Sequence, residues 1–366
     1  MINLTSENRE IELNSKERVL KSIDHQHTDR IPITFDAEIE VYESLQKHLR
    51  VTSKEQLFHR LNVDTWMILP KNFIYPEEEL SKKEKKSIWG YKTTLTQYRG
   101  GAYDELIFSP LAGKNDLIDI DNFPWPKGDA LNFSHFMAEI EAHKNQAIIG
   151  VFTWGAYFIA TFVRGLEDLM TDFILRKSYA QHLIETIAEK CYYFLDKLLR
   201  EQGDGIDIVY MADDYCSQQG PFFSPAAFKE FILPYLKKVV ERVHKADKKF
   251  LLHVCGAVRP LLPSIIEAGV DMLEPIQTRA TGMEPETLKR DFGNDICFYG
   301  GMDLQQILNK GTVEKVQSET KRLINVLGEG GGYIFGPGHT YIQVDAPIEN
   351  ILAMYKTAYE YRPFSP

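Results

Sequence analysis

The feature that most constrains the fold is a regular alternation of short apolar runs and amphipathic segments from residue 147 onward. Each apolar run has about five residues, the size of a strand buried on both faces. The segments between them repeat apolar residues every three to four positions, as helices that cover a sheet do. This alternation predicts a parallel sheet with helical crossovers. The predicted strands are residues 147–152, 206–211, 249–253, 271–275, 296–299 and 332–335.

Two earlier apolar runs, residues 33–35 and 66–69, bring the number of predicted strands to eight. Eight strand and helix units fit a closed (β/α)8 barrel better than an open doubly wound sheet, which has a glycine-rich phosphate turn after its first strand. Neither G-x-G-x-x-G nor G-x-x-x-x-G-K-[ST] occurs in the chain, so a nucleotide cofactor is not expected. We therefore predict the α/β class, with residues 1–366 forming a single (β/α)8 TIM-barrel domain.

An N-terminal helical extension and a β-hairpin insertion fall outside this repeat. Residues 14–17 have the form of a helix capping box, and a helical stripe follows them. Residues 88–99 and 103–108 alternate in hydrophobicity on either side of two glycines, which predicts a hairpin near residues 86–110. Charged residues before it and prolines after it mark residues 86–126 as an insertion at the rim of the barrel.

The composition of the chain restricts its expected binding partners and its expected cellular compartment. The chain has 42 Lys and Arg residues against 52 Asp and Glu residues, a formal net charge of -10, which argues against nucleic acid and anionic membranes as partners. Residues 1–14 lack a secretory pattern, and no apolar run approaches the roughly 18 residues needed to span a bilayer. The widely separated Cys191, Cys216, Cys255 and Cys297 suit a reducing compartment. We expect a cytoplasmic protein, with Cys191 and Cys297 as core residues.

Polar residues follow most of the predicted strands. In a TIM barrel the chemistry lies at the carboxyl ends of the strands, so these side chains are expected to face one common mouth. Two histidines, two thiols and several carboxylates are more than a structural rim requires. The strand-end residues are, in chain order, Asp36, Glu38, Asp213, Asp214, Cys216, His253, Cys255, Glu274, Gln277, Asp303, His339 and Gln343.

His253 and Cys255 form the most specific pair among these residues. An imidazole and a thiolate one residue apart can face one ion only if the strand has ended and the backbone turns, which Gly256 permits. His339 follows a Pro-Gly turn rather than an apolar face, so it is expected in the site as a metal ligand or as a donor to substrate. The pattern indicates a Zn²⁺ site; the alternative is a packed thiol beside a hydrogen-bonded histidine.

Several segments in a fixed order resemble one known family. The resemblance covers nearly the whole chain and is clearest at residues 210–214, 219–225, 252–260, 267–271, 299–303 and 347–354. On these segments the chain is similar to the uroporphyrinogen decarboxylase superfamily, which also holds the cobamide-dependent methyltransferases. The resemblance implies a single TIM barrel.

Departures from the decarboxylase pattern favour the methyltransferase branch. The decarboxylases carry an Arg-Gln-Ala-Gly-Arg segment whose arginines hold carboxylates of the tetrapyrrole, whereas residues 36–41 of this chain are acidic. Each lost arginine–carboxylate pair would cost roughly 1.5 to 3 kcal/mol of binding free energy for the tetrapyrrole. The Phe-Ser-Asp segment of the decarboxylases is replaced by Leu-Pro-Lys at residues 69–71. Only His339 matches a decarboxylase active-site residue.

The resemblance to the methyltransferases implies a ligand set and a partner. That branch uses a His-x-Cys pair and a distant third ligand, usually cysteine, and these positions are occupied here by His253, Cys255 and His339. Glu274 is a candidate fourth ligand. The implied activity is zinc-dependent methyl transfer between a small molecule and a corrinoid carried by a partner protein. Further expected roles are catalysis for Asp213, Asp214 and His339, and substrate binding for Asp36, Glu38, Gln277, Asp303 and Gln343.

Two other functions stay open on the sequence. One is decarboxylation of a tetrapyrrole without metal, with His339 as donor and Asp213 or Asp214 in place of the usual aspartate. The other is a non-catalytic barrel that binds a corrinoid or tetrapyrrole and acts through a partner.

Overall fold

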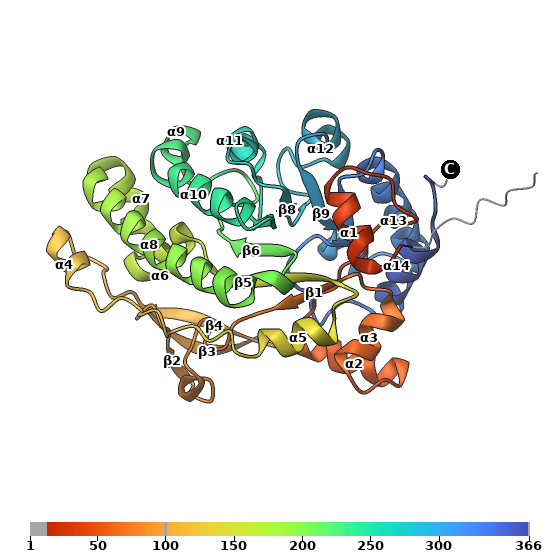
Figure 1. Cartoon of the computed structure of the whole chain (residues 1–366), viewed down its shortest axis with the longest axis horizontal. Coiled ribbons are helices and arrows are strands. Elements are labelled where there is room, and N and C mark those ends of the chain that lie inside the picture. Colours follow the sequence, from red (N-terminus) through yellow and green to blue (C-terminus); the bar gives the residue numbers. More distant parts are fainter. Residues whose placement is uncertain (1–12, 99–100, 365–366) are drawn as a thin grey trace, which may run out of the picture.

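Seven parallel strands form the central sheet of the computed structural model, which describes residues 13–98 and 101–364. The sheet curls around a central axis with helices on its outside (Figure 1). The strand order β1-β5-β6-β7-β8-β9-β10 follows the chain, as in a TIM barrel, so the predicted fold is confirmed. The strands are β1 (Thr65–Ile68), β5 (Ala147–Trp154), β6 (Ile208–Ala212), β7 (Lys249–His253), β8 (Met272–Glu274), β9 (Cys297–Met302) and β10 (Tyr333–Pro337).

An irregular segment stands where the sequence predicted the strand at residues 33–35, so that prediction is wrong. Ile33 forms one isolated parallel bridge with Phe335 of β10, and the N–H of Asp64 donates to Ile33 on the other side. The Ile33 N–H itself donates to the Asp64 side chain at 2.8 Å. Because this N–H is taken by a carboxylate, a continuous ladder cannot form, although the segment still lies between β10 and β1.

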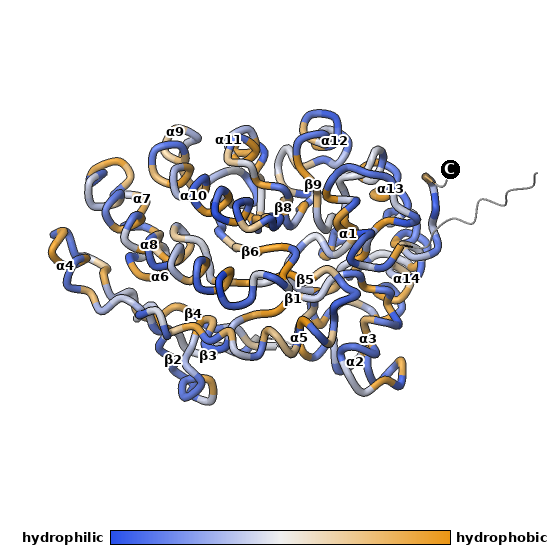
Figure 2. Tube along the Cα trace, viewed as in Figure 1, coloured by the Kyte–Doolittle hydropathy of each residue, from blue (hydrophilic) through white to orange (hydrophobic). Residues whose placement is uncertain are grey.

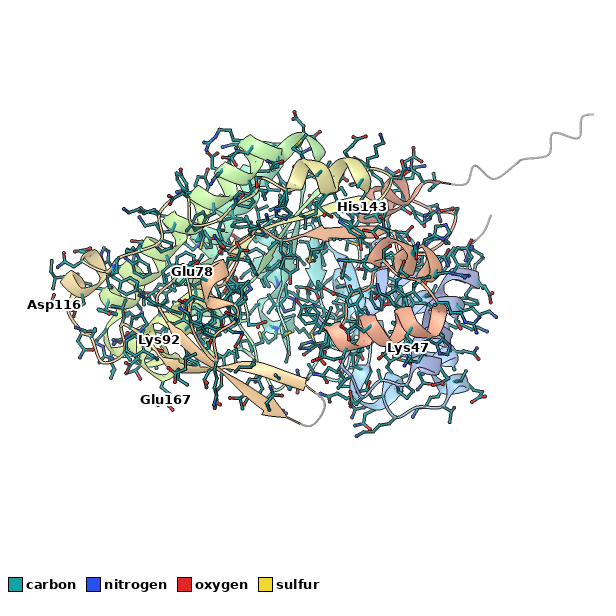
Figure 3. All side chains as sticks on the ribbon, turned by 90° about the horizontal axis from the view of Figure 1, so that it is seen from below. Lys47, Glu78, Lys92, Asp116, His143 and Glu167 are labelled. Carbon is teal, nitrogen blue, oxygen red and sulfur yellow. The ribbon has the colours of Figure 1, made fainter. Side chains whose placement is uncertain are left out.

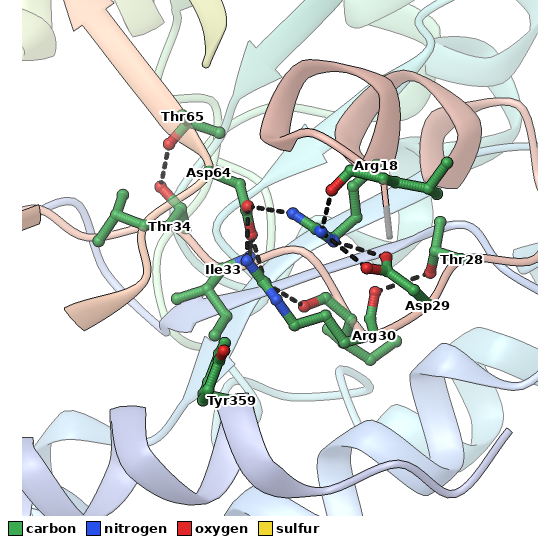
Figure 4. Close-up of polar contacts among 12 residues, drawn as sticks. Arg18, Thr28, Asp29, Arg30, Ile33, Thr34, Asp64, Thr65 and Tyr359 are labelled. Carbon is green, nitrogen blue, oxygen red and sulfur yellow. Dashed lines mark hydrogen bonds and ion pairs between the residues drawn. The ribbon is translucent and has the colours of Figure 1, made fainter. Parts of the chain in front are cut away.

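The same Asp64 carboxylate is the centre of a buried ion network that fixes the first helix, α1 (Ser15–Ile23) (Figure 4). Asp64 pairs with Arg18 at 2.7 Å and with Arg30 at 2.6 Å, and Arg18 also pairs with Asp29 at 2.7 Å. Although burial alone would lower the pKa of the Arg18 guanidinium, the two carboxylates raise it above its usual value. The network joins α1 to the segment before β1.

α1 closes the amino-terminal end of the barrel. Its capping box at Asn14 and Glu17 is present as predicted. Val19 and Ile23 of α1 belong to the same buried cluster as the inward-facing side chains of the strands, so the barrel floor is packed rather than open. The inward-facing members of this cluster are Ala147, Ile149, Val151, Ile208, Tyr210, Leu251, Met272, Cys297, Tyr299 and Ile334.

A second, larger apolar layer lies between the strands and the surrounding helices. Hydrophobic and hydrophilic residues alternate along these helices (Figure 2). Cys191 and Cys297 are fully buried, which confirms their prediction as core residues. Charged side chains such as Lys47 and Glu167 point outward (Figure 3). The α-helices are α2 (Ile39–Leu49), α3 (Lys54–Leu61), α4 (Leu117–Asp121), α5 (Phe136–Ala142), α6 (Ala156–Arg164), α7 (Leu166–Leu175), α8 (Lys177–Gln202), α9 (Pro225–Ala227), α10 (Leu233–His244), α11 (Leu262–Glu267), α12 (Pro285–Phe292), α13 (Val313–Gly328) and α14 (Ile348–Glu360). Within the described ranges, no helix is both long and apolar enough to cross a membrane.

The predicted hairpin is a three-stranded antiparallel sheet that projects from the barrel (Figure 1). Its strands are β2 (Glu84–Lys86), β3 (Lys92–Tyr98) and β4 (Gly101–Phe108). The sequence indicated β3 and β4 but not the charged β2, and the tip at residues 99–100 lies outside the described residues.

Candidate active site at the carboxyl ends of the strands

Three side chains from two neighbouring strand ends converge on one point. His253 is the last residue of β7, Cys255 follows two residues later, and Asp214 follows the end of β6. Their potential ligand atoms all lie within 4.8 Å of one another. The Cys255 Sγ is 3.2 Å from the His253 Nε2, and the Asp214 Oδ1 is 3.5 Å from the same nitrogen. These three residues, which we call the rim cluster, are the only such group of three or more among the described residues.

A turn at Gly256 brings Cys255 to the same side as His253, as the sequence predicted. Gly256 has a φ of +90°, which L side chains rarely adopt, and a Cβ there would lie 2.3 Å from the carbonyl oxygen of Ser217. The turn also lets the backbone N–H of Cys255 donate to Asp214 at 3.1 Å. The glycine, the thiol and the carboxylate are therefore parts of one local geometry.

Glu274 contacts the opposite side of the His253 ring. The two residues are register partners on β8 and β7, and the Glu274 carboxylate contacts Nδ1 of His253. Burial alone would lower the pKa of His253, but the charge of Glu274 raises it well above its usual value. The carboxylate holds a proton on Nδ1 and leaves Nε2 facing Cys255 and Asp214. Glu274, expected as a fourth ligand, is thus positioned to orient the histidine.

The two adjacent aspartates have different surroundings. Asp213 is fully buried, and its carboxylate accepts hydrogen bonds from the Phe158 N–H at 2.6 Å and the Tyr215 hydroxyl at 2.9 Å. Burial raises the pKa of Asp213 to about 7. Asp214 belongs to the rim cluster. Burial alone would raise the pKa of its carboxyl group, but the hydrogen bond and the charge of His253 lower this pKa below its usual value. Asp213 therefore fixes the first turn of α6, whereas the Asp214 carboxylate lies beside His253 and Cys255.

His339 lies near the rim cluster but outside the close group. It follows β10, its side chain is exposed, and it is not among the three residues with ligand atoms within 4.8 Å. Desolvation by the surrounding protein, followed by the charge of His253, lowers the pKa of His339. Asp214 occupies the third place in the group that the sequence assigned to His339. Two consecutive aspartates give no local signal of which one turns toward the mouth, so sequence reasoning did not place Asp214 in one group with His253 and Cys255.

A pocket opens beside the rim cluster, across the ends of β8, β9 and β10; we call it the rim pocket. Its volume is about 140 Å³. Of the residues predicted to bind substrate, Gln277, Asp303 and Gln343 converge here with His339. Sequence reasoning missed Arg279 and Gln218, whose only signal was a place shortly after a strand end. The pocket is lined by Gln218, Gln277, Thr278, Arg279, Asp303, Leu304, Gln305, Gly338, His339 and Gln343.

Asp36 and Glu38, the other two residues predicted to bind substrate, do not line the rim pocket. The Asp36 carboxylate accepts a hydrogen bond from the Tyr42 hydroxyl at 3.1 Å. Burial raises the pKa of Asp36 to about 6, and the charge of Glu274 acts in the same direction. Glu38 precedes α2, and its backbone N–H donates to Ile342 at 3.0 Å. These two acidic residues follow the irregular segment that lies between β10 and β1.

The fold and the position of the cluster define a barrel protein with a polar site at the carboxyl ends of its strands. A model of the uroporphyrinogen decarboxylase family matches residues 128–361, more than half of the chain. The chain belongs to this family.

Relatives with two different activities match the chain at equal identity. A methylcobamide:CoM methyltransferase, MtaA, from Methanosarcina barkeri is 25% identical over 267 residues, which cover 68% of this chain and 73% of the relative. A uroporphyrinogen decarboxylase from Hordeum vulgare is 25% identical over 265 residues, which cover 69% of this chain and 74% of the relative. The structure of a methyltransferase from Methanosarcina mazei has the same fold, with a TM-score of 0.68 at 17% identity, covering 95% of this chain and 99% of that chain.

Proposed function

We propose that this protein is a methyltransferase that uses Zn²⁺ at His253, Cys255 and Asp214 to activate a small molecule for methyl exchange with a corrinoid protein. The observation that carries the proposal is the convergence of the three ligand atoms within 4.8 Å. One imidazole nitrogen, one thiolate and one carboxylate are a donor set typical of zinc. Three protein ligands leave the fourth position to substrate, as catalytic zinc sites do.

The residues around the cluster have separate roles in this proposal. A zinc ion held there would lower the proton affinity of a substrate thiol or polarise an ether oxygen. Glu274 orients His253, because a carboxylate on Nδ1 fixes the tautomer that offers Nε2 to the ion. His339, at the edge of the rim pocket, hydrogen-bonds the substrate instead of completing the ligand set.

The proposed corrinoid-protein partner follows from the activity of a relative and from the exposed side of the rim pocket. MtaA acts on a methylcobamide, and the exposed side of the rim pocket would admit a methyl group carried on another protein. In the direction of a thiol acceptor, the sulfur–carbon bond forms while the cobalt–carbon bond breaks. The electron pair stays with cobalt, and the thiol proton leaves to solvent.

Decarboxylation of a tetrapyrrole is the second candidate, because a decarboxylase matches the chain at equal identity. Two observations weigh against it. Acidic Asp36 and Glu38 stand where the decarboxylases carry carboxylate-binding arginines. Asp213, one of the two aspartates suggested for the reaction, is fully buried and already accepts two hydrogen bonds. A non-catalytic tetrapyrrole-binding barrel would leave the rim cluster without a role.

Metal analysis of the purified protein tests the proposal. We expect close to one equivalent of zinc in the wild type and less than about half in His253→Ala and Cys255→Ser. Cys216→Ser is the matched control, because Cys216 is buried nearby but is not part of the rim cluster. Equal zinc in all four proteins would contradict the proposed ligands, and less carboxylated product from uroporphyrinogen without metal would support decarboxylation instead.

A further inference from the structure

An unusual ion pair lies in the rim pocket. The Arg279 Nη1 and the Asp303 Oδ2 are 3.8 Å apart, beyond the roughly 2.7 to 2.9 Å of a charge-assisted hydrogen bond. The Arg279 side chain is 59% exposed, whereas that of Asp303 is 8% exposed. Opposite charges therefore face one pocket without a direct hydrogen bond between them.

Asp303 is held in place by its other oxygen. Its Oδ1 accepts the backbone N–H groups of Gln305 at 2.9 Å and Gln306 at 3.2 Å, at the start of η5 (Leu304–Leu308). This cap fixes the carboxylate, while Oδ2 accepts no hydrogen bond from the described residues and remains on the side of Arg279. The Arg279 guanidinium likewise makes no hydrogen bond with any of the described residues. Each group of the pair retains hydrogen-bonding capacity that a ligand can use.

Neutral amides form much of the remaining wall. Gln277 accepts the Gly256 N–H at 2.9 Å and also the Gln218 side chain through its Oε1, which leaves its NH₂ group without an acceptor among the described residues. The pocket contains one guanidinium and one carboxylate, so its formal charge balances. A ligand with one charge would satisfy one of the two groups, and a ligand with both charges would satisfy both.

We propose that the rim pocket binds the zwitterionic head of a small amino-acid thiol, or of its methyl thioether. Arg279 binds the carboxylate and Asp303 binds the ammonium group. The assignment of the thiol rests on the proposed function, because it places the reacting sulfur at the rim cluster.

One contact connects the pocket to the cluster. Gln277, which lines the pocket, accepts the backbone N–H of Gly256, the residue after Cys255, at 2.9 Å. A head group bound between Arg279 and Asp303 therefore has the rim cluster beside it. A volume of about 140 Å³ suits the head group of a small molecule.

Calorimetry on the zinc-loaded full chain with matched thiols tests the proposal. The probes share the carbon chain of L-homocysteine: L-homocysteine itself has both charges, 4-mercaptobutyrate has the anion alone, 3-aminopropane-1-thiol has the cation alone and 1-propanethiol has neither. We expect L-homocysteine to bind at least about tenfold more tightly than either singly charged thiol, since each lost charged contact weakens binding by about that factor. Equal affinities within about twofold would overturn the proposal.

Two variants should each weaken the binding of a different singly charged thiol. Arg279→Gln is expected to weaken the binding of L-homocysteine and 4-mercaptobutyrate by about tenfold and to leave the binding of 3-aminopropane-1-thiol unchanged. Asp303→Asn, which keeps an oxygen for the cap, is expected to weaken the binding of L-homocysteine and 3-aminopropane-1-thiol and to leave the binding of 4-mercaptobutyrate unchanged. Arg290→Gln is the control, because Arg290 pairs with Asp291 outside the pocket. A uniform loss for all four probes in both variants would indicate misfolding of the pocket and contradict the assigned roles.

L-2-aminobutyrate, which has the same head and no sulfur, separates this proposal from the zinc proposal. It is expected to bind wild type and Cys255→Ser equally, and to lose about tenfold in Arg279→Gln. Zinc binding without this selectivity would overturn the head-group site alone. Selectivity for the zwitterion in a protein that binds no zinc would support the head-group site and contradict the proposed reaction.

Discussion

Glu274 and His253 face each other across the pairing of β8 and β7, and the Glu274 carboxylate contacts the Nδ1 of His253 on the side away from Cys255. Both side chains are buried. A strand register thereby fixes the orientation of a proposed metal ligand, because neighbouring residues of parallel strands point to the same side of a sheet.

The first prediction concerns this contact. Glu274→Gln is expected to weaken zinc binding by about 10- to 100-fold, because the amide no longer holds the proton on Nδ1 as the carboxylate does. Competition with a chelator measures the affinity. Glu267→Gln serves as the control, since Glu267 forms an exposed pair with Lys237. Unchanged zinc affinity in Glu274→Gln would remove the orienting role.

The second prediction separates the two adjacent aspartates. Asp213→Ala leaves the Phe158 N–H and the Tyr215 hydroxyl without their partner, so the free energy of unfolding should fall by about 2 to 4 kcal/mol. Asp214→Ala should change stability by less than about 1 kcal/mol and reduce zinc occupancy. Urea unfolding and metal analysis of both variants measure these effects. The assignment fails if the two variants show the reverse pattern.

The third prediction concerns the turn after β7. Gly256→Ala places a methyl group 2.3 Å from the Ser217 carbonyl oxygen at a φ of +90°. We expect a loss of about 2 kcal/mol or more in stability, together with weaker zinc binding because Cys255 is displaced. Gly220→Ala is a matched control in the same loop region, where a Cβ meets nothing within 4 Å. Thermal unfolding and metal analysis report the two effects, and equal behaviour of the two variants would contradict the prediction.

The fourth prediction is a dependence of stability on pH. Burial raises the pKa of Asp36 to about 6, above the usual value for a carboxyl group in an unfolded chain. The unfolded chain therefore releases this proton at lower pH than the folded chain. As a result, the contribution of Asp36 to the free energy of unfolding falls as pH rises from about 4 to about 6. Asp36→Asn, which cannot ionise, should gain stability relative to wild type over this interval. Urea unfolding at several pH values measures the difference, and a constant difference from pH 4 to pH 7 would argue against the raised pKa.

The periodic parts of the fold could be read from the sequence because they depend on local spacing. Alternating apolar runs and helical stripes predicted the barrel, and the capping box at Asn14 and Glu17 predicted the start of α1. The prediction of a strand at residues 33–35 is wrong because the Asp64 side chain, about thirty positions away, accepts the Ile33 N–H that a strand would use for pairing. Charged β2 has no strand pattern of its own and forms only because β3 pairs with it.

The sequence by itself determined the barrel, the turn at Gly256 and the placement of His253 and Cys255 at one strand end, since each follows from a few consecutive residues. Only the tertiary structure decided that Asp214 rather than His339 joins them in one close group. It also decided that Glu274 lies behind the imidazole. Convergence of side chains from separate loops depends on strand register and on the path of each turn, and neither is encoded in the spacing of residues along the chain.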